Sequence, residues 1–137
     1  MNHYRKTIHK YRNRQKALGC PFCDQNTIAK ATFENEFLYI VPNLTPYDLW
    51  ELHDVEDHLL VIPKRHVKSL GELNNKERLA IMDMLADYEG QGYNIYARGV
   101  GFVKRSVTHQ HTHLIKVGNQ KPKIALFVKT PYYLFKR

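Results

Sequence analysis

Runs of apolar residues and their alternation with polar ones predict five strands. Strands are expected over residues 27–33 and 36–42, and the apolar run "HLLVIP" at 58–63 predicts a buried strand. Two more are expected over 93–98 and 107–116, separated by a loop that contains two glycines. Much of the chain is therefore predicted to be β-structure.

Apolar residues at helical spacing predict one long helix over residues 75–89. Asn74 or Asn75 is expected to cap its first turn, since Asn is a preferred N-cap residue. The residues expected on its buried side are Leu79, Met82, Leu85 and Ala86.

A second, shorter amphipathic helix is predicted over residues 3–18. Tyr4, Ile8 and Tyr11 recur there at helical spacing among basic residues. We interpret residues 1–19 as a basic N-terminal extension and 20–137 as one domain, because 137 residues suffice for one core but not two. Strands and helices without repeats or a linker predict an α+β fold with a mainly antiparallel sheet.

Composition changes the picture in two ways. The longest apolar runs fall short of the roughly 18 residues that span a bilayer, and no apolar segment of a secretory signal follows the basic start. A cytoplasmic protein is therefore expected, with no membrane partner. The formal net charge is +8, and all 13 acidic residues lie between Asp24 and Glu89. The basic ends are either a solvated face or a field that attracts anions, phosphates above all.

The segment "SVTHQHTHLI" at 106–115 carries three histidines at alternate positions: His109, His111 and His113. On a strand all three would project from one face. The row could be structural, with each buried imidazole hydrogen-bonded. It could be an all-histidine zinc centre that activates water. It could also be divided, one histidine binding a structural metal while a neighbour acts as a nucleophile on phosphorus.

The two cysteines, Cys20 and Cys23, form a CxxC pair in "CPFC". Structural zinc takes four Cys or His ligands, and no second close pair follows. The remaining ligands would have to be distant histidines, namely His66 and one member of the row. A redox pair of the thioredoxin type should open a helix directly after a strand, which the basic segment before Cys20 does not resemble. Zinc, redox chemistry and inert thiols stay open on spacing alone.

Three segments together resemble the histidine triad (HIT) superfamily. "SVTHQHTHLI" resembles its His-x-His-x-His signature, "DHLLVIPKRHV" at 57–67 its second characteristic segment, and "CPFC" the cysteine knuckle of its zinc-containing bacterial members. The segments occur in family order. The resemblance implies a five-stranded antiparallel sheet with two main helices, and a homodimer. It also implies a hydrolase or transferase of nucleotidyl groups, acting on dinucleoside polyphosphates or nucleoside phosphoramidates.

The resemblance also implies roles for individual residues. His111 would attack the α-phosphate and form a nucleotidyl-histidine, while His113 and His58 match positions that contact the phosphate or assist the leaving group. The backbone carbonyl of His109 would orient the nucleophile. Ser106 matches a hydroxyl near the leaving group, and Asn43 resembles a nucleotide-contacting position. A structural Zn²⁺ would be bound by Cys20, Cys23, His66 and His109.

The chain departs from the family pattern at two places. Arg98 and Arg105 stand where many members have amides that contact phosphates, and "DLWELHDVED" at 48–57 lengthens a connection. Because Arg is always charged and binds phosphate with a fork of donors, these arginines favour a highly charged substrate; alternatively they pair with acids of 48–57. A second interpretation of the whole chain is a nucleic-acid-binding HIT-like module that uses its basic termini, with little or no catalysis.

Overall fold

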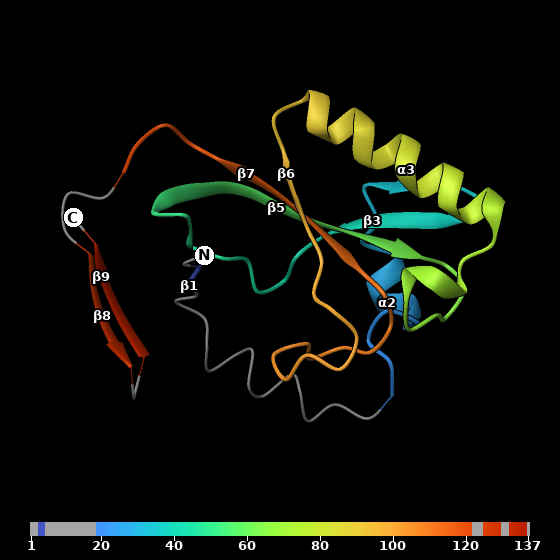
Figure 1. Cartoon of the computed structure of the whole chain (residues 1–137), viewed down its shortest axis with the longest axis horizontal. Helices are drawn as coiled ribbons and strands as arrows, with labels where there is room; N and C mark the ends of the chain where they lie inside the picture. Colours follow the sequence, from blue (N-terminus) through green and yellow to red (C-terminus); the bar gives the residue numbers. More distant parts are fainter. Residues whose placement is uncertain (1–2, 5–18, 122–124, 130–131, 137) are drawn as a thin grey trace.

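An antiparallel sheet forms the centre of the computed structural model, which describes residues 3–4, 19–121, 125–129 and 132–136 (Figure 1). Five strands lie side by side in the order β2, β3, β5, β7, β6. Their bounds are Phe33–Glu34, Leu38–Pro42, His53–Pro63, Thr112–Val117 and Asn94–Tyr96, respectively. The predicted five-stranded antiparallel sheet of an α+β fold is therefore confirmed.

The predicted strand over 27–33 is wrong in its first half. Residues Gln25–Ile28 form a short helix, α2, whose first turn is capped by the Asp24 side chain accepting from the Asn26 amide at 3.0 Å. A local cap thus decides the conformation there, and only Phe33 enters a strand. The other helix, α3, spans Asn75–Gly90, and a 3-10 turn at Leu70–Glu72 precedes it.

The helix α3 buries a different side from the one its sequence pattern predicts. Leu79 and Met82 are 64% and 62% exposed. Ala86 is exposed too, whereas Leu85 packs on the sheet as predicted. The other residues that pack there are Ala80, Ile81, Met84 and Tyr88. Both sets recur at helical spacing, so periodicity could not choose between them. Glu77 decides the rotation, because it is buried and bonded on the inner side.

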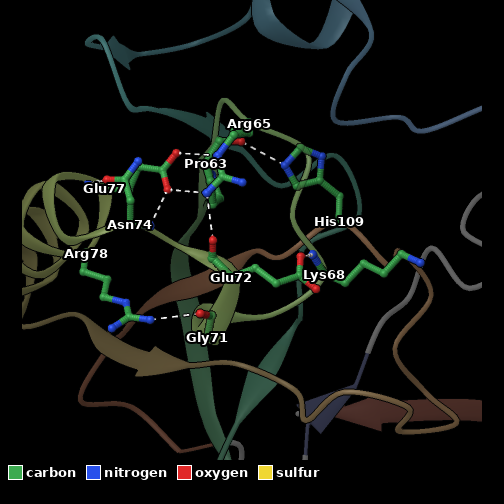
Figure 2. Close-up of polar contacts among 9 residues, drawn as sticks. All are labelled: Pro63, Arg65, Lys68, Gly71, Glu72, Asn74, Glu77, Arg78 and His109. Atoms are coloured by element: carbon green, nitrogen blue, oxygen red, sulfur yellow. Dashed lines mark hydrogen bonds and ion pairs between the residues drawn. The ribbon is translucent and has the colours of Figure 1, made fainter.

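The first turn of α3 is held by a closed set of polar contacts (Figure 2). The Asn74 side chain accepts from the Glu77 amide at 3.0 Å, while Glu77 Oε2 accepts from the Asn74 amide at 2.8 Å. Arg65 donates to both carboxylate oxygens of Glu77, at 2.8 and 2.7 Å. The predicted cap at Asn74 is confirmed, and the segment that follows β5 is tied to α3.

Replacing Glu77 with Gln is expected to lower the free energy of unfolding by about 2–3 kcal/mol, because a charged, buried hydrogen-bond partner is lost. The Arg65 hydrogen bonds lower the pKa of Glu77, so this stabilisation is present above the ordinary carboxyl pKa of about 4.3 and is lost as pH falls through the lowered pKa. Urea denaturation at pH 7 and in acid measures both effects. Glu89→Gln, an exposed change in the same helix, should stay within about 0.5 kcal/mol; equal effects from the two substitutions would contradict the prediction.

The two faces of the sheet bury separate clusters. Leu38, Ile40, Leu59 and Val61 face α3, whereas Tyr39, Val41, Leu60 and Ile62 face the segment containing Phe22 and α2. Residues paired across antiparallel strands share a face, and His113 of β7 pairs with Leu60. The histidine therefore lies on the face opposite α3.

The long connection at 48–57 forms a β-hairpin that extends this sheet. It contains β4 (Leu49–Trp50) and the first part of β5, joined by Glu51 and Leu52, both at positive φ. Two positive φ values match the twist of a tight hairpin, although neither residue is the Gly or Asn usual there. A bulge between Val55 and Asp57 follows in the pairing with β7. No sequence pattern predicted this hairpin.

Two further pieces lie at the ends of the described chain. β1 (His3–Tyr4) pairs with β4, so the helix predicted over 3–18 does not begin at His3, and residues 5–18 lie outside the described residues. β8 (Ala125–Lys129) and β9 (Tyr132–Lys136) form a hairpin of their own. Within the described residues no helix is long and apolar enough to cross a membrane.

Candidate functional site

Four potential metal ligands from three distant segments meet at one end of the sheet. Their ligand atoms all lie within 4.8 Å of one another. His109 Nδ1 is 3.5 Å from the sulfur of each cysteine, and His66 Nδ1 is 3.3 Å from Cys23 Sγ. A tetrahedron with Zn–S bonds near 2.3 Å and Zn–N bonds near 2.0 Å has S···N edges of about 3.5 Å. The cluster of Cys20, Cys23, His66 and His109 is therefore compatible with a metal site.

The proton positions around His109 also suit a metal ligand. Its Nε2–H donates to the carbonyl of Pro63 at 2.8 Å, shown in Figure 2. The proton is then on Nε2, so Nδ1 turns a lone pair toward the two sulfurs. A ligating histidine commonly donates its other N–H to a carbonyl in this way. Burial lowers the pKa of His109, which keeps the ring neutral as a ligand must be.

The cysteines lie in a tight turn in which the Cys23 amide donates to the Cys20 carbonyl at 3.2 Å. Burial, together with the neighbouring Cys20, raises the pKa of the Cys23 thiol. Two thiolates this close need a cation to stabilise their charge, and a bound divalent metal would supply it.

His111 stands apart from this cluster and has a different set of contacts. It lies just before β7, so of the three histidines in the row only His113 belongs to the strand. The Nδ1–H of His111 donates to the backbone carbonyl of His109 at 2.8 Å. This contact places the proton on Nδ1 and leaves the lone pair on Nε2. Among the described residues, no hydrogen bond to that Nε2 is found.

Burial lowers the pKa of His111 to about 4, and the positive charges of Arg105 and Arg98 act in the same direction. The hydrogen bond to the His109 carbonyl opposes them but does not prevail. His111 is therefore neutral near pH 7. A neutral imidazole with a free lone pair is the form that can act as a nucleophile.

His58 and His113 form a buried pair on the same face of the sheet. His58 Nε2 is 2.9 Å from His113 Nδ1, and both side chains are less than 5% exposed. The Tyr47 amide donates to His58 Nδ1 at 3.0 Å, so the proton of a neutral His58 is on Nε2 and is donated to His113. His113 in turn carries its proton on Nε2. One backbone amide thus sets the tautomers of both rings.

Aromatic rings from the segment before β4 and from β6 pack on this pair, and Trp50 of β4 packs on them in turn. Tyr47 stacks on His113 with centroids 5.8 Å apart, and on Trp50 at 6.0 Å. Tyr96 of β6 lies 5.7 Å from the His113 ring. The histidine row gave no reason to select Tyr47, Trp50 or Tyr96. Of the three, only Trp50 lies in the lengthened connection at 48–57.

The remaining predicted site residues lie around these histidines. Asn43 lies beside His58, with Nδ2 3.2 Å from Nε2, and its Oδ1 accepts from the Thr45 amide at 3.0 Å. Ser106 is exposed in the segment before the row. Of the eleven predicted site residues, all except the exposed Ser106 have described contacts within the site or with its supporting loops.

Arg98 and Arg105 make most of their described contacts with backbone carbonyls. Arg105 donates to the carbonyls of Lys68 and Thr108, at 2.6 and 2.9 Å. Arg98 donates to the Lys104 carbonyl and, at 3.1 Å, to the Tyr47 hydroxyl. They therefore brace the loop before the row, and their positive charges help to lower the pKa of His111.

Solved structures with the same arrangement of elements decide the fold. A HIT family hydrolase from Clostridium thermocellum is 22% identical, with 80% of this chain and 99% of that chain covered and a TM-score of 0.54. The chain has the histidine triad fold. A HIT family hydrolase from Legionella pneumophila is 19% identical, over 77% of this chain and 96% of that one, with a TM-score of 0.52.

A third solved structure with the histidine triad fold is a histidine triad nucleotide-binding protein from Candida albicans. It is 20% identical, with 79% of this chain and 86% of that one covered and a TM-score of 0.51. Neither the family models nor the curated protein sequences contain a match to this chain. The likeness is therefore one of fold, carried by backbone arrangement at low sequence identity.

Proposed function

We propose that the chain is a nucleotide hydrolase or nucleotidyl transferase that forms a covalent nucleotidyl-histidine on His111. The observation that carries the proposal is the state of this ring: neutral, with Nδ1–H held by the His109 carbonyl at 2.8 Å. The same fold occurs in proteins named HIT family hydrolase and histidine triad nucleotide-binding protein, which supports nucleotide substrates.

The proposed reaction has two steps. His111 Nε2 attacks the α-phosphorus, and the bond from phosphorus to the leaving oxygen or nitrogen breaks as the leaving group takes up a proton. Water then attacks the same phosphorus, the P–N bond to His111 breaks, and a nucleoside monophosphate is released. As positive charge develops on the attacking ring, the His109 carbonyl stabilises it through the Nδ1–H bond.

The neighbouring residues would hold the phosphate and the leaving group. In this scheme the Nε2–H of His113 donates to a phosphate oxygen, and Ser106 assists the leaving group. His58 uses its ring nitrogens on Tyr47 and His113, so its part is to hold His113 in the donating tautomer. Asn43, whose Nδ2 lies 3.2 Å from the same His58 nitrogen, would contact the nucleotide.

We also propose that the four-residue cluster binds a structural Zn²⁺. Cys20, Cys23, His66 and His109 supply four ligands, the set typical of a structural rather than a catalytic zinc. The metal would join three segments that are far apart in the sequence. His111 and His113 would then not bind the metal. This arrangement is the third alternative for the row, in which one histidine binds a structural metal and a neighbour is the nucleophile.

Intact-mass analysis of the protein after incubation with nucleotides tests this function. Adenosine phosphoramidate and a diadenosine polyphosphate are mixed with the wild type and quenched without acid, since a phosphoramidate bond to histidine is acid-labile. A mass increase equal to one adenylyl group is expected. Absence of the adduct with every nucleotide, combined with binding to short oligonucleotides that weakens steeply with salt, would instead favour the nucleic-acid-binding module.

The same panel tests whether the arginines select a more highly charged substrate. If Arg105 attracts the additional phosphates, Arg105→Gln should lose activity on the diadenosine polyphosphate and keep it on the phosphoramidate. An unchanged preference would leave Arg105 with only its bracing contacts to the Lys68 and Thr108 carbonyls.

A homodimer is part of the same proposal. Leu79 and Met82 on the outer side of α3 and Ile95 of β6 are exposed apolar residues, and β6 ends the five-stranded sheet. A second copy would cover this surface. Of the two basic ends considered for nucleic-acid binding, the basic residues of 5–18 lie outside the described residues, whereas most of those after Gly90 lie within them.

A further inference from the structure

We propose that Phe22 is a positioning residue for His111, through which the Cys20–Cys23 turn controls the orientation of the attacking ring. The proposal rests on the proposed function and extends it. Phe22 lies between the two cysteines in the sequence, and its ring meets that of His111 edge-on, with centroids 5.0 Å apart and an interplanar angle of 64°.

Phe22 contacts both parts of the site at once. Its ring is also 6.1 Å from that of His109, again edge-on at 74°. Edge-to-face contacts at these distances are directional as well as apolar. Phe22 therefore limits rotation of the His111 ring about the one hydrogen bond that holds its Nδ1.

The backbone of Phe22 is itself fixed. Its carbonyl accepts a hydrogen bond from the hydroxyl of Tyr39, which is fully buried. The Phe22 side chain packs against the cluster of Tyr39, Val41, Leu60 and Ile62 on the site face of the sheet. The turn can therefore move only if this packing or the cysteines on either side are disturbed.

A second contact runs from the cysteine cluster to His111. His109 faces the two sulfurs through its side chain, while its backbone carbonyl accepts from His111 Nδ1. The His111 ring is thus held on one side by a residue between the cysteines and on the other by a residue that faces them. A metal bound by these four residues would fix both contacts. Binding or loss of the metal should therefore change the orientation of the His111 ring.

The test compares Phe22→Leu with Phe22→Tyr, which keeps the ring. Phe33→Leu is the matched control, because Phe33 is partly exposed on β2. For Phe22→Leu we expect a single-turnover rate of adenylylation about 10–100-fold below wild type, since a small displacement of a reacting group has effects of this size. The KM should change by less than about threefold and the metal content should not change, because Phe22 binds neither substrate nor metal. Phe22→Tyr should restore the rate.

Nuclear magnetic resonance of the His111 ring nitrogens gives a readout independent of activity. Phe22→Leu should shift or broaden the His111 signals and leave those of His53 in place. Removing the metal from the wild type with a chelator, and adding Zn²⁺ back, should move the same signals reversibly. This arm tests the link from the cysteine cluster to His111, which His109 shares with Phe22. If Phe22→Leu does not fold, Phe22→Met is measured in its place, so that the contribution of Phe22 itself is still tested.

The outcomes separate the two proposals. An adenylylation rate in Phe22→Leu within twofold of wild type, or His111 signals indifferent to both Phe22→Leu and the metal, would overturn the positioning role. If wild type forms no adduct with any nucleotide, the proposed function fails instead, and the His111 signals still report whether Phe22 and the metal orient the ring.

Discussion

Replacing His111 with Ala is expected to abolish the nucleotidyl adduct and to reduce nucleotide turnover by about 10⁴-fold or more, as loss of a covalent nucleophile does elsewhere. The ring supplies the only protein atom that bonds to phosphorus in the proposed reaction. Turnover is measured with adenosine phosphoramidate, and the adduct by intact mass. The substitution removes a side chain outside the cysteine cluster, so one equivalent of metal should remain bound.

His53→Ala is the matched control, because His53 lies in the inserted hairpin and its Nδ1 contacts only the Glu51 carbonyl among the described hydrogen bonds. Its turnover should stay within about twofold of wild type, as expected for a surface change. If His111→Ala kept a tenth of the activity, the covalent mechanism would be wrong. If it lost its metal, the row would be an all-histidine metal centre.

The second large effect is expected at the cysteine turn. Cys20→Ser should reduce bound zinc from about one per chain to nearly none, because it removes one of four ligands. Since a ligand present at about 1,000 times its Kd stabilises the folded state by about 4 kcal/mol, the loss should appear as a large fall in Tm. Metal content by mass spectrometry and thermal unfolding with and without a chelator measure both quantities.

The wild type treated with chelator should unfold at the same temperature as Cys20→Ser, and the variant should not respond to the chelator. His113→Ala should keep its zinc, since His113 pairs with His58 rather than with the cysteines. Full zinc content in Cys20→Ser would show that this cluster does not hold the metal.

Sequence patterns predicted the strands best where burial and alternation coincide. The run 58–63 lies inside β5, and 36–42 contains β3, because both are central strands with buried side chains. The pattern failed where a local contact overrode it. Asp24 caps a helical turn within the strand expected from residue 27, and Glu77 turns α3 away from the side that carries Leu79.

For the site as well, the sequence pattern predicted one part and the tertiary structure decided another. The residue types of the row and of CxxC pointed to metal binding, nucleophilic attack or redox chemistry, with a purely structural role as the alternative. Spacing could not say which histidine does which. The tertiary structure separates them through hydrogen bonds: His109 turns its Nδ1 to sulfur, His111 turns its Nδ1 to a carbonyl, and His113 accepts from His58.

By itself the sequence determined that the chain has an α+β fold with an antiparallel sheet and three histidines before or within a strand. These features follow from local periodicity and residue chemistry, which are readable along the chain. Only the tertiary structure decided that Tyr47 sets the tautomers of the buried pair and that Phe22 touches His111. Both contacts join residues far apart in sequence, and such contacts are determined by how the sheet brings segments together rather than by any local pattern.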